Sequence, residues 1–293
     1  MPPPPMLLLR ILFALATTLA CATAALADGS ADALKARHVA LLPALTQNGF
    51  GRPLHVDSAD TSGKLKSEIH AVVTHPFAQV ADALTSREAW CSILILPFNI
   101  KQCLAPPDGR TLSIRIGRKS DQPVEDTYLV KFTFRTVHQG ADHLEVRLEA
   151  AQGPFGTHDH RIAVEAIPLD AQRSFIRFSY EHGYGITARL AMQAYLATVG
   201  SNKVGFSVLG RTAKGEPVYV GGMRAVIERN AMRYFLAIDA YLNAPDDADR
   251  RMLDWFTASE RYPLQLHEMD QATYLRIKRK EILAKAPPEM SPR

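Results

Sequence analysis

The sequence has few cysteines, no strong excess of charge of either sign, and no long apolar run beyond its start. Lysine and arginine number 34 against 30 acidic residues, and this net charge of +4 does not favour a nucleic-acid partner. After the first 27 residues, no apolar run reaches the roughly 20 residues that a membrane-spanning helix needs. With 47% apolar and 22% charged residues, the chain is typical of a globular protein that buries a full core.

Common catalytic motifs are also missing. The sequence contains no Gly-x-Ser-x-Gly, no His-Glu-x-x-His and no Walker motif, and Gly183-Tyr184-Gly185 lacks the continuation of a phosphate loop. His158-Asp159-His160 would place two imidazoles on one face of a strand, which is the start of a metal site. No third ligand is indicated, so a role at the start of a strand is favoured. We expect no metal and no cofactor.

The first 27 residues have the pattern of a signal peptide. Arg10 is their only charge, residues 11–22 are almost wholly apolar or small, and residues 25–27 (Ala-Leu-Ala) suit a cleavage site. Met6 is an alternative start, since it follows a run of four prolines. A weak lipoprotein box at Cys21 is the alternative to cleavage. The sequence therefore predicts export, to the periplasm or outside the cell, with a lipid anchor at Cys21 as the minor alternative.

Cleavage after residue 27 would leave two cysteines, Cys91 and Cys103. Their spacing is unlike the Cys-x-x-Cys of redox pairs, and export favours oxidation. We therefore predict a disulfide between them, with free buried thiols as the alternative.

Residues 63–245 alternate apolar and polar side chains over several short stretches, which is typical of strands with one buried face. A first strand at 64–74 leads through Pro76 into two short helices. Further strands are expected at 112–116, 128–135, 144–149, 162–166 and 176–180. A helix at 186–199, a strand at 203–209 and a long apolar helix at 222–242 follow.

The segments on either side of this region are simpler. Residues 28–62 are expected to form a lead-in segment, with a helix at 31–44 followed by a loop. Residues 246–293 are expected to form a helical tail, with helices at 249–260 and 264–285. The end of this tail is basic, so contact with an acidic membrane surface is one alternative to an ordinary solvated helix face.

This order of elements resembles the helix-grip fold of the START-like superfamily, which includes lipid-transfer domains, Bet v 1 allergens and polyketide cyclases. The run from Ile69 to Phe77, in which a strand passes into a helix through Pro76, and the later Trp90 carry this resemblance. It implies an α+β fold in which a curved antiparallel sheet of about seven strands wraps on a long C-terminal helix. Residues 222–241 also resemble a group of exported proteobacterial proteins, a likeness that implies no activity.

The resemblance further implies a cavity between the sheet and the long helix. The alternation of the strands predicts that the lining is aromatic: Tyr128, Phe132, Phe134, Phe178, Tyr180 and Phe235. The leading hypothesis is binding or carriage of a lipid or other hydrophobic small molecule, with the helix at 186–199 as a cap on the mouth. One alternative is a cyclase or hydratase that uses Tyr180, His182 and Asp239 as acid and base. The other is a solid-core envelope protein that acts through its surface and basic tail. A binding protein is favoured over an enzyme.

Overall fold

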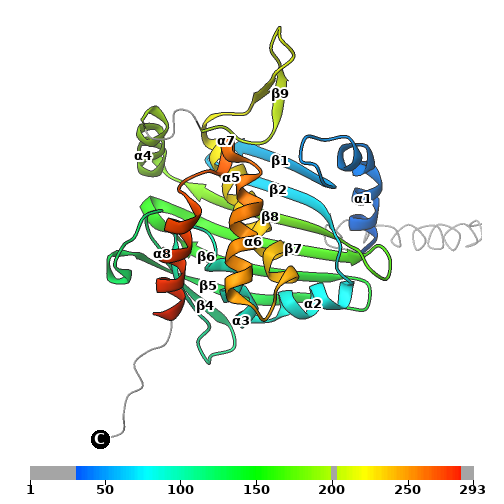
Figure 1. The fold of residues 1–293 in the computed structure, drawn as a ribbon, viewed down its shortest axis with the longest axis horizontal. Coiled ribbons are helices and arrows are strands. Elements are labelled where there is room, and N and C mark those ends of the chain that lie inside the picture. Colours follow the sequence, from blue (N-terminus) through cyan, green and yellow to red (C-terminus); the bar gives the residue numbers. More distant parts are fainter. Residues whose placement is uncertain (1–30, 199–202, 285–293) are drawn as a thin grey trace, which may run out of the picture.

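The computed structural model describes residues 31–198 and 203–284 (Figure 1). The predicted signal peptide, the lipidation alternative at Cys21 and the last nine residues lie outside the described part. The body is one eight-stranded antiparallel sheet with strand order β1-β2-β8-β7-β6-β5-β4-β3. Its strands are β1 (Leu54–Thr61), β2 (Lys64–Val73), β3 (Ile100–Leu104), β4 (Thr111–Ile116), β5 (Tyr128–Gln139), β6 (Leu144–Gln152), β7 (Thr157–Pro168) and β8 (Ser174–Tyr184).

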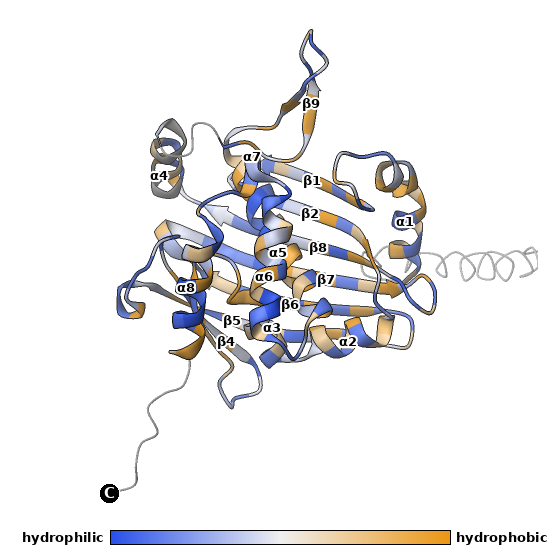
Figure 2. Ribbon diagram, in the orientation of Figure 1, coloured by the Kyte–Doolittle hydropathy of each residue, from blue (hydrophilic) through white to orange (hydrophobic). Residues whose placement is uncertain are grey.

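Hydrophilic and hydrophobic residues alternate along many of the strands (Figure 2). Because successive side chains point to opposite faces, this alternation gives the sheet one dry face and one charged face. On the charged face, a row of ion pairs crosses neighbouring strands. Lys64 and Arg161 both contact Glu181, at 3.0 and 3.4 Å. Arg161 and Arg135 both contact Glu149, at 2.9 Å each. Such cross-strand pairs of opposite charge support the register that buries the apolar face.

The long helix α5 (Gly222–Asn243) lies across the dry face (Figure 1) and packs on β1, β2 and β8. In the helical tail, α6 (Ala248–Glu260) and α7 (Pro263–Leu266) cover the other side of α5, and α8 (Gln271–Leu283) packs on α6 and β3. Asp247 and Asp270 cap α6 and α8 through backbone N–H groups. Trp255, fully buried on α6, donates its indole N–H to the carbonyl of Arg233 at 2.9 Å. The helix is therefore enclosed on both sides, which explains why 14 of its 22 residues are buried.

Two short helices, α2 (Phe77–Thr85) and α3 (Arg87–Leu94), follow β2 as predicted. Ser86 caps α3, since its hydroxyl accepts from the N–H of Ala89 at 3.1 Å. A disulfide joins Cys91 of α3 to Cys103 of β3, and both residues are buried. This confirms the predicted pairing. The α+β helix-grip class, with a long closing helix and an extra helical tail, is also confirmed by the strand order and the position of α5.

The strands differ from the prediction in three details. The expected loop before residue 63 contains β1, which pairs with β2 at the edge of the sheet, and β3 was also missed. The expected strand at 203–209 is not part of the main sheet. Instead, β9 (Val208–Arg211) and β10 (Pro217–Tyr219) form a separate hairpin that projects from the body (Figure 1). The sheet consequently has eight strands rather than about seven.

Glu228 of α5 holds the segment before this hairpin. Its carboxylate is fully buried and accepts hydrogen bonds from the N–H groups of Phe206 and Ser207, at 2.6 and 2.9 Å. The hydroxyl of Ser58, on β1, donates to the same carboxylate at 2.5 Å. Side-chain bonds to α5 thus take the place of the sheet pairing expected for this stretch.

The remaining helices lie at the margins of the sheet. The helix α1 (Ala31–Thr46) packs on the charged face, where Leu34, Leu41 and Leu45 meet Ile167 and Phe175. The helix α4 (Ile186–Ala197) follows β8 and contacts the short turn η2 (Pro154–Gly156). The helix expected at 264–285 is divided between α7 and α8. Within the described ranges, no helix combines the length and apolar character that crossing a membrane requires.

Candidate functional site

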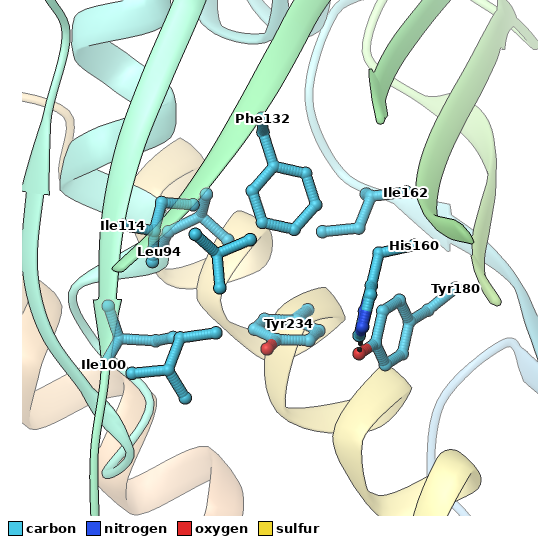
Figure 3. A pocket seen from close by; sticks show the side chains of 10 residues that line it. Leu94, Ile100, Ile114, Phe132, His160, Ile162, Tyr180 and Tyr234 are labelled. Carbon is cyan, nitrogen blue, oxygen red and sulfur yellow. Dashed lines mark hydrogen bonds between the residues drawn. The ribbon is translucent and has the colours of Figure 1, made fainter. Parts of the chain in front are cut away.

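The dry face of the sheet and α5 enclose a small cavity (Figure 3). Its volume is about 20 Å³, which is room for about one water molecule. Ligand pockets are usually larger, on the order of 300 Å³ or more. The described residues that line it are Leu94, Ile100, Ile114, Ile116, Val130, Phe132, His160, Ile162, Tyr180 and Tyr234. The interior is thus mostly aliphatic and closely packed.

Three polar side chains meet inside this apolar lining. His160 of β7 and Tyr180 of β8 are neighbours because Ile162 and Tyr180 pair in the sheet register. The Nδ1 atom of His160 lies 3.3 Å from the Tyr180 hydroxyl, and its Nε2 atom lies 2.9 Å from Oγ1 of Thr157. Tyr234 comes from α5, and its ring meets that of Tyr180 edge-on with centroids 5.5 Å apart. The sheet and the helix therefore both contribute polar groups to one end of the cavity.

Burial keeps all three groups uncharged near neutral pH. It lowers the pKa of His160 to about 4, and the nearby His182 acts in the same direction. It raises the pKa of Tyr180 well above 10 and that of Tyr234 to about 12. The cavity therefore offers hydrogen-bonding groups without a charge.

The structure places the six predicted lining residues in three settings. Phe132 and Tyr180 line the cavity. Phe134, Phe178 and Phe235 are buried in the same core but do not reach it.

Tyr128 lies at the start of β5 and is 49% exposed. Its ring contacts Phe155, with centroids 5.0 Å apart, and Phe155 is itself 66% exposed. This aromatic pair therefore lies at the surface near one end of the sheet, outside the cavity.

The three predicted acid–base residues are not all together. His182 lies two residues after Tyr180 on β8, and its ring stacks on His160 with centroids 5.1 Å apart. Asp239 instead bonds Arg52 and lines a separate cleft of about 780 Å³ between α5 and α6. The structure brings Tyr180 and His182 together and leaves Asp239 elsewhere.

The two histidines of the possible metal pair also separate. The β7–β8 register shifts between His158 and Arg161, and Asp159 has a φ of 50°. As a result His160 is buried in the cavity, whereas His158 stays partly exposed beside Asp159, 2.8 Å from its carboxylate. In the described residues, no group of three or more potential ligands is arranged to hold a metal.

The sequence interpretation did not assign His160 or Tyr234 to the cavity lining, and it considered His160 only as part of a possible metal pair. His160 follows the same two-residue period as Ile162 and Val164, so the alternation of β7 already indicated an inward side chain. Tyr234 belongs to the apolar face predicted for the long helix, but that pattern could not distinguish cavity from core.

The basic tail is partly neutralised. Lys280 pairs with Asp121 at 3.1 Å and Arg279 with Asp249 at 2.7 Å. Lys278 is buried and pairs with Glu281 at 2.7 Å. Several of the cations counted in the tail are therefore engaged within the protein.

Comparisons with known proteins give similar solved structures. A conserved protein from Geobacillus kaustophilus is 8% identical, with 61% of this chain and 95% of that chain covered and a TM-score of 0.36. A point mutant of norcoclaurine synthase from Thalictrum flavum is 13% identical, with 64% and 100% covered and a TM-score of 0.35. Human STARD10 is 8% identical, with 50% and 69% covered and a TM-score of 0.32.

A scan of protein-family models and a search of curated proteins both give no match. These three structural similarities have TM-scores of 0.36 or less, so they carry no argument about function. The chain is a helix-grip protein by its own strand order and by the packing of its long helix.

Proposed function

We propose that this protein is exported and binds a hydrophobic small molecule or lipid between the sheet and α5. One observation carries the proposal: a cavity with aliphatic and aromatic walls also contains an imidazole and two phenols. His160 bonds Tyr180 and Thr157, and Tyr234 bonds Asn99, so these groups have partners in this structure. Burial of polar groups costs free energy that a purely apolar core avoids. A ligand with one polar end would bond the Tyr180 hydroxyl in place of His160 and replace the water for which the cavity has room.

Binding requires that the cavity widen. At about 20 Å³ it accepts no molecule larger than water, so lining side chains must move apart when a ligand enters. The helix α4 adjoins β8 and η2, both of which lead to His160 and Tyr180, although no described residue of α4 lines the cavity. We propose α4 as the element that governs exchange. Pinning α4 to η2 with an engineered disulfide should slow ligand exchange, and an unchanged rate would remove α4 from this role.

The small volume favours a second candidate, a filled interior with function at the surface. In that case the water-sized cavity is a packing defect, and contact with a partner or an acidic membrane through the basic tail carries the activity. An enzyme remains the third possibility, with Tyr180 and His182 as the polar pair. This pair lacks the third acid–base residue of the prediction, because Asp239 lies in another cleft.

Native mass spectrometry with organic extraction, on protein purified from its own compartment, tests the proposal. A stoichiometric hydrophobic molecule that co-purifies would support it and identify the ligand class. The control is the Phe132→Trp variant, in which a larger ring fills the cavity and should reduce the amount of bound molecule. Equal amounts in both proteins would place the molecule elsewhere, and an empty wild-type protein that also fails to bind added lipids would favour the filled interior.

A further inference from the structure

The described lining of the interior cavity contains hydrogen-bonding groups but no charged side chain. Arg233 precedes Tyr234 on α5, yet its guanidinium contacts Glu268 at 2.6 Å, away from the lining. The polar groups that do line the cavity are one imidazole and two phenols, each less than 10% exposed.

These groups are suited to a neutral partner. A hydroxyl or carbonyl group needs only hydrogen bonds when it is buried, and the Tyr180 hydroxyl can donate one. The Tyr234 hydroxyl already bonds Asn99. A carboxylate would enter without a counter-charge, and a buried charge without an opposite partner is strongly disfavoured. His160 cannot provide that charge at neutral pH, because its imidazole is neutral in this setting.

The hydrogen bond between His160 and Tyr180 can be replaced by a bond from Tyr180 to a ligand. At 3.3 Å it is slightly longer than the roughly 2.7–3.2 Å of a well-formed hydrogen bond between nitrogen and oxygen. His160 is also held from its other side by Thr157, at 2.9 Å. The Tyr180 hydroxyl can therefore turn to a ligand while the imidazole keeps its place.

From this arrangement we infer that the cavity selects ligands whose polar end is an uncharged hydroxyl or carbonyl, and rejects the matching carboxylates. The inference rests on the proposed function, since it specifies the ligand class of the same cavity. Tyr180 is its donor, and the ring of Tyr234 bounds the same end of the cavity from the helix side.

Isothermal titration calorimetry with 1-decanol and decanoate at pH 8 tests the inference on the full exported chain. The two probes have the same alkyl chain, and decanoate is fully ionised at that pH. We expect decanol to bind about tenfold or more tightly than decanoate. Tyr180→Phe should weaken decanol binding about three- to tenfold and leave decanoate binding nearly unchanged. Tyr184→Phe is the matched control, because that hydroxyl bonds Asp60 outside the cavity; it should change neither affinity.

The outcomes separate the two proposals. Equal or tighter binding of decanoate overturns the inference and leaves a hydrophobic ligand site in place. The same loss in Tyr184→Phe as in Tyr180→Phe also overturns it, because the contact would then lie elsewhere. If neither probe binds and broader lipid mixtures do not bind either, the proposed function fails together with the inference.

Discussion

Arg52 and Asp239 form a two-pronged ion pair, with Nη1–Oδ2 and Nη2–Oδ1 distances of 2.7 and 3.1 Å. Arg52 lies just before β1, and Asp239 lies near the end of α5. The guanidinium also lies over the ring of Phe235, 5.5 Å from its centroid. Both partners are mostly buried, at 20% and 15% exposed. The pair therefore fastens the N-terminal edge of the sheet to the closing helix.

Replacing Asp239 with asparagine should lower stability without changing ligand binding. Hydrogen bonds to charged groups each contribute about 1.5–3 kcal/mol, so we expect a loss of about 2 kcal/mol in urea unfolding. Asp254→Asn is the control, because its partner Arg250 is 64% exposed and such pairs contribute less than about 1 kcal/mol. If the Asp239→Asn variant kept its full stability but lost ligand binding or turnover, Asp239 would belong to the functional site.

Glu281 should be far more sensitive to substitution than other acidic residues that pair with the tail. Its carboxylate accepts from Lys101 and Lys278 at 2.9 and 2.7 Å, and all three side chains are at most 6% exposed. Glu281→Gln would leave two buried ammonium groups without an opposite charge, which costs about 3–5 kcal/mol. Asp249→Asn, which breaks an exposed pair with Arg279, should cost under about 1 kcal/mol. Thermal and urea unfolding of both variants provide the comparison.

His70 should make the protein less stable in mild acid. It is fully buried beneath α1, its Nδ1 atom has no hydrogen-bond partner among the residues that the structure describes, and burial lowers its pKa from 6.5 to about 4. Between these two values the unfolded chain binds more protons than the folded one, so the free energy of unfolding falls as pH falls. From pH 7 to pH 5 this residue accounts for a loss of about 2 kcal/mol.

The His70→Gln variant isolates that contribution. Urea unfolding at pH 7 and pH 5 should show a pH-dependent loss about 2 kcal/mol smaller than in the wild-type protein. His160, whose pKa is also lowered to about 4, contributes equally in both proteins and cancels in the comparison. Identical losses would mean that His70 titrates normally in the folded state.

Two valine substitutions measure the space inside the protein. Val130 lines the cavity, so the extra methylene of Val130→Ile fits into it and should change the unfolding free energy by less than about 1 kcal/mol. Val164 is fully buried in the same core but away from the cavity, and Val164→Ile should cost about 1–3 kcal/mol. Equal costs in urea unfolding would indicate that the interior is filled at Val130 too.

The strands with clear alternation were predictable because their faces differ sharply. On β5, Val130, Phe132 and Phe134 are buried while Lys131 and Thr133 are exposed. By contrast, β1 carries only two buried residues, Leu54 and Val56, and ends in a polar run that resembles a loop. An edge strand tolerates such a sequence, because it has a partner on one side only.

The short strand β3 was not predicted, for a different reason. Lys101 is fully buried there, since Glu281 and the carbonyl of Phe98 hold its ammonium group. A charged residue in the core breaks the alternation by which a strand is recognised. Its partner lies 180 residues further along the chain, so nothing near Lys101 indicates the pairing.

The polar end of the cavity depends on contacts that one sequence does not reveal. His160 meets Tyr180 because of the pairing register of β7 and β8, which shifts after His158. Tyr234 joins them only through the placement of α5 over the sheet. The strand patterns therefore indicated which face is dry, whereas the convergence of these three groups required the three-dimensional fold.

The strand β3 ends the sheet, so one of its sides has no strand neighbour. The tail helix α8 lies against it: Lys278 donates to the carbonyl of Ile100 at 2.7 Å, and the Tyr274 hydroxyl donates to that of Leu96 at 3.1 Å. An uncovered strand edge is a template for pairing with other chains. The C-terminal helix thus covers this edge against pairing with other chains, and its removal would expose the edge together with the buried ammonium group of Lys101, which Glu281 of the same helix neutralises.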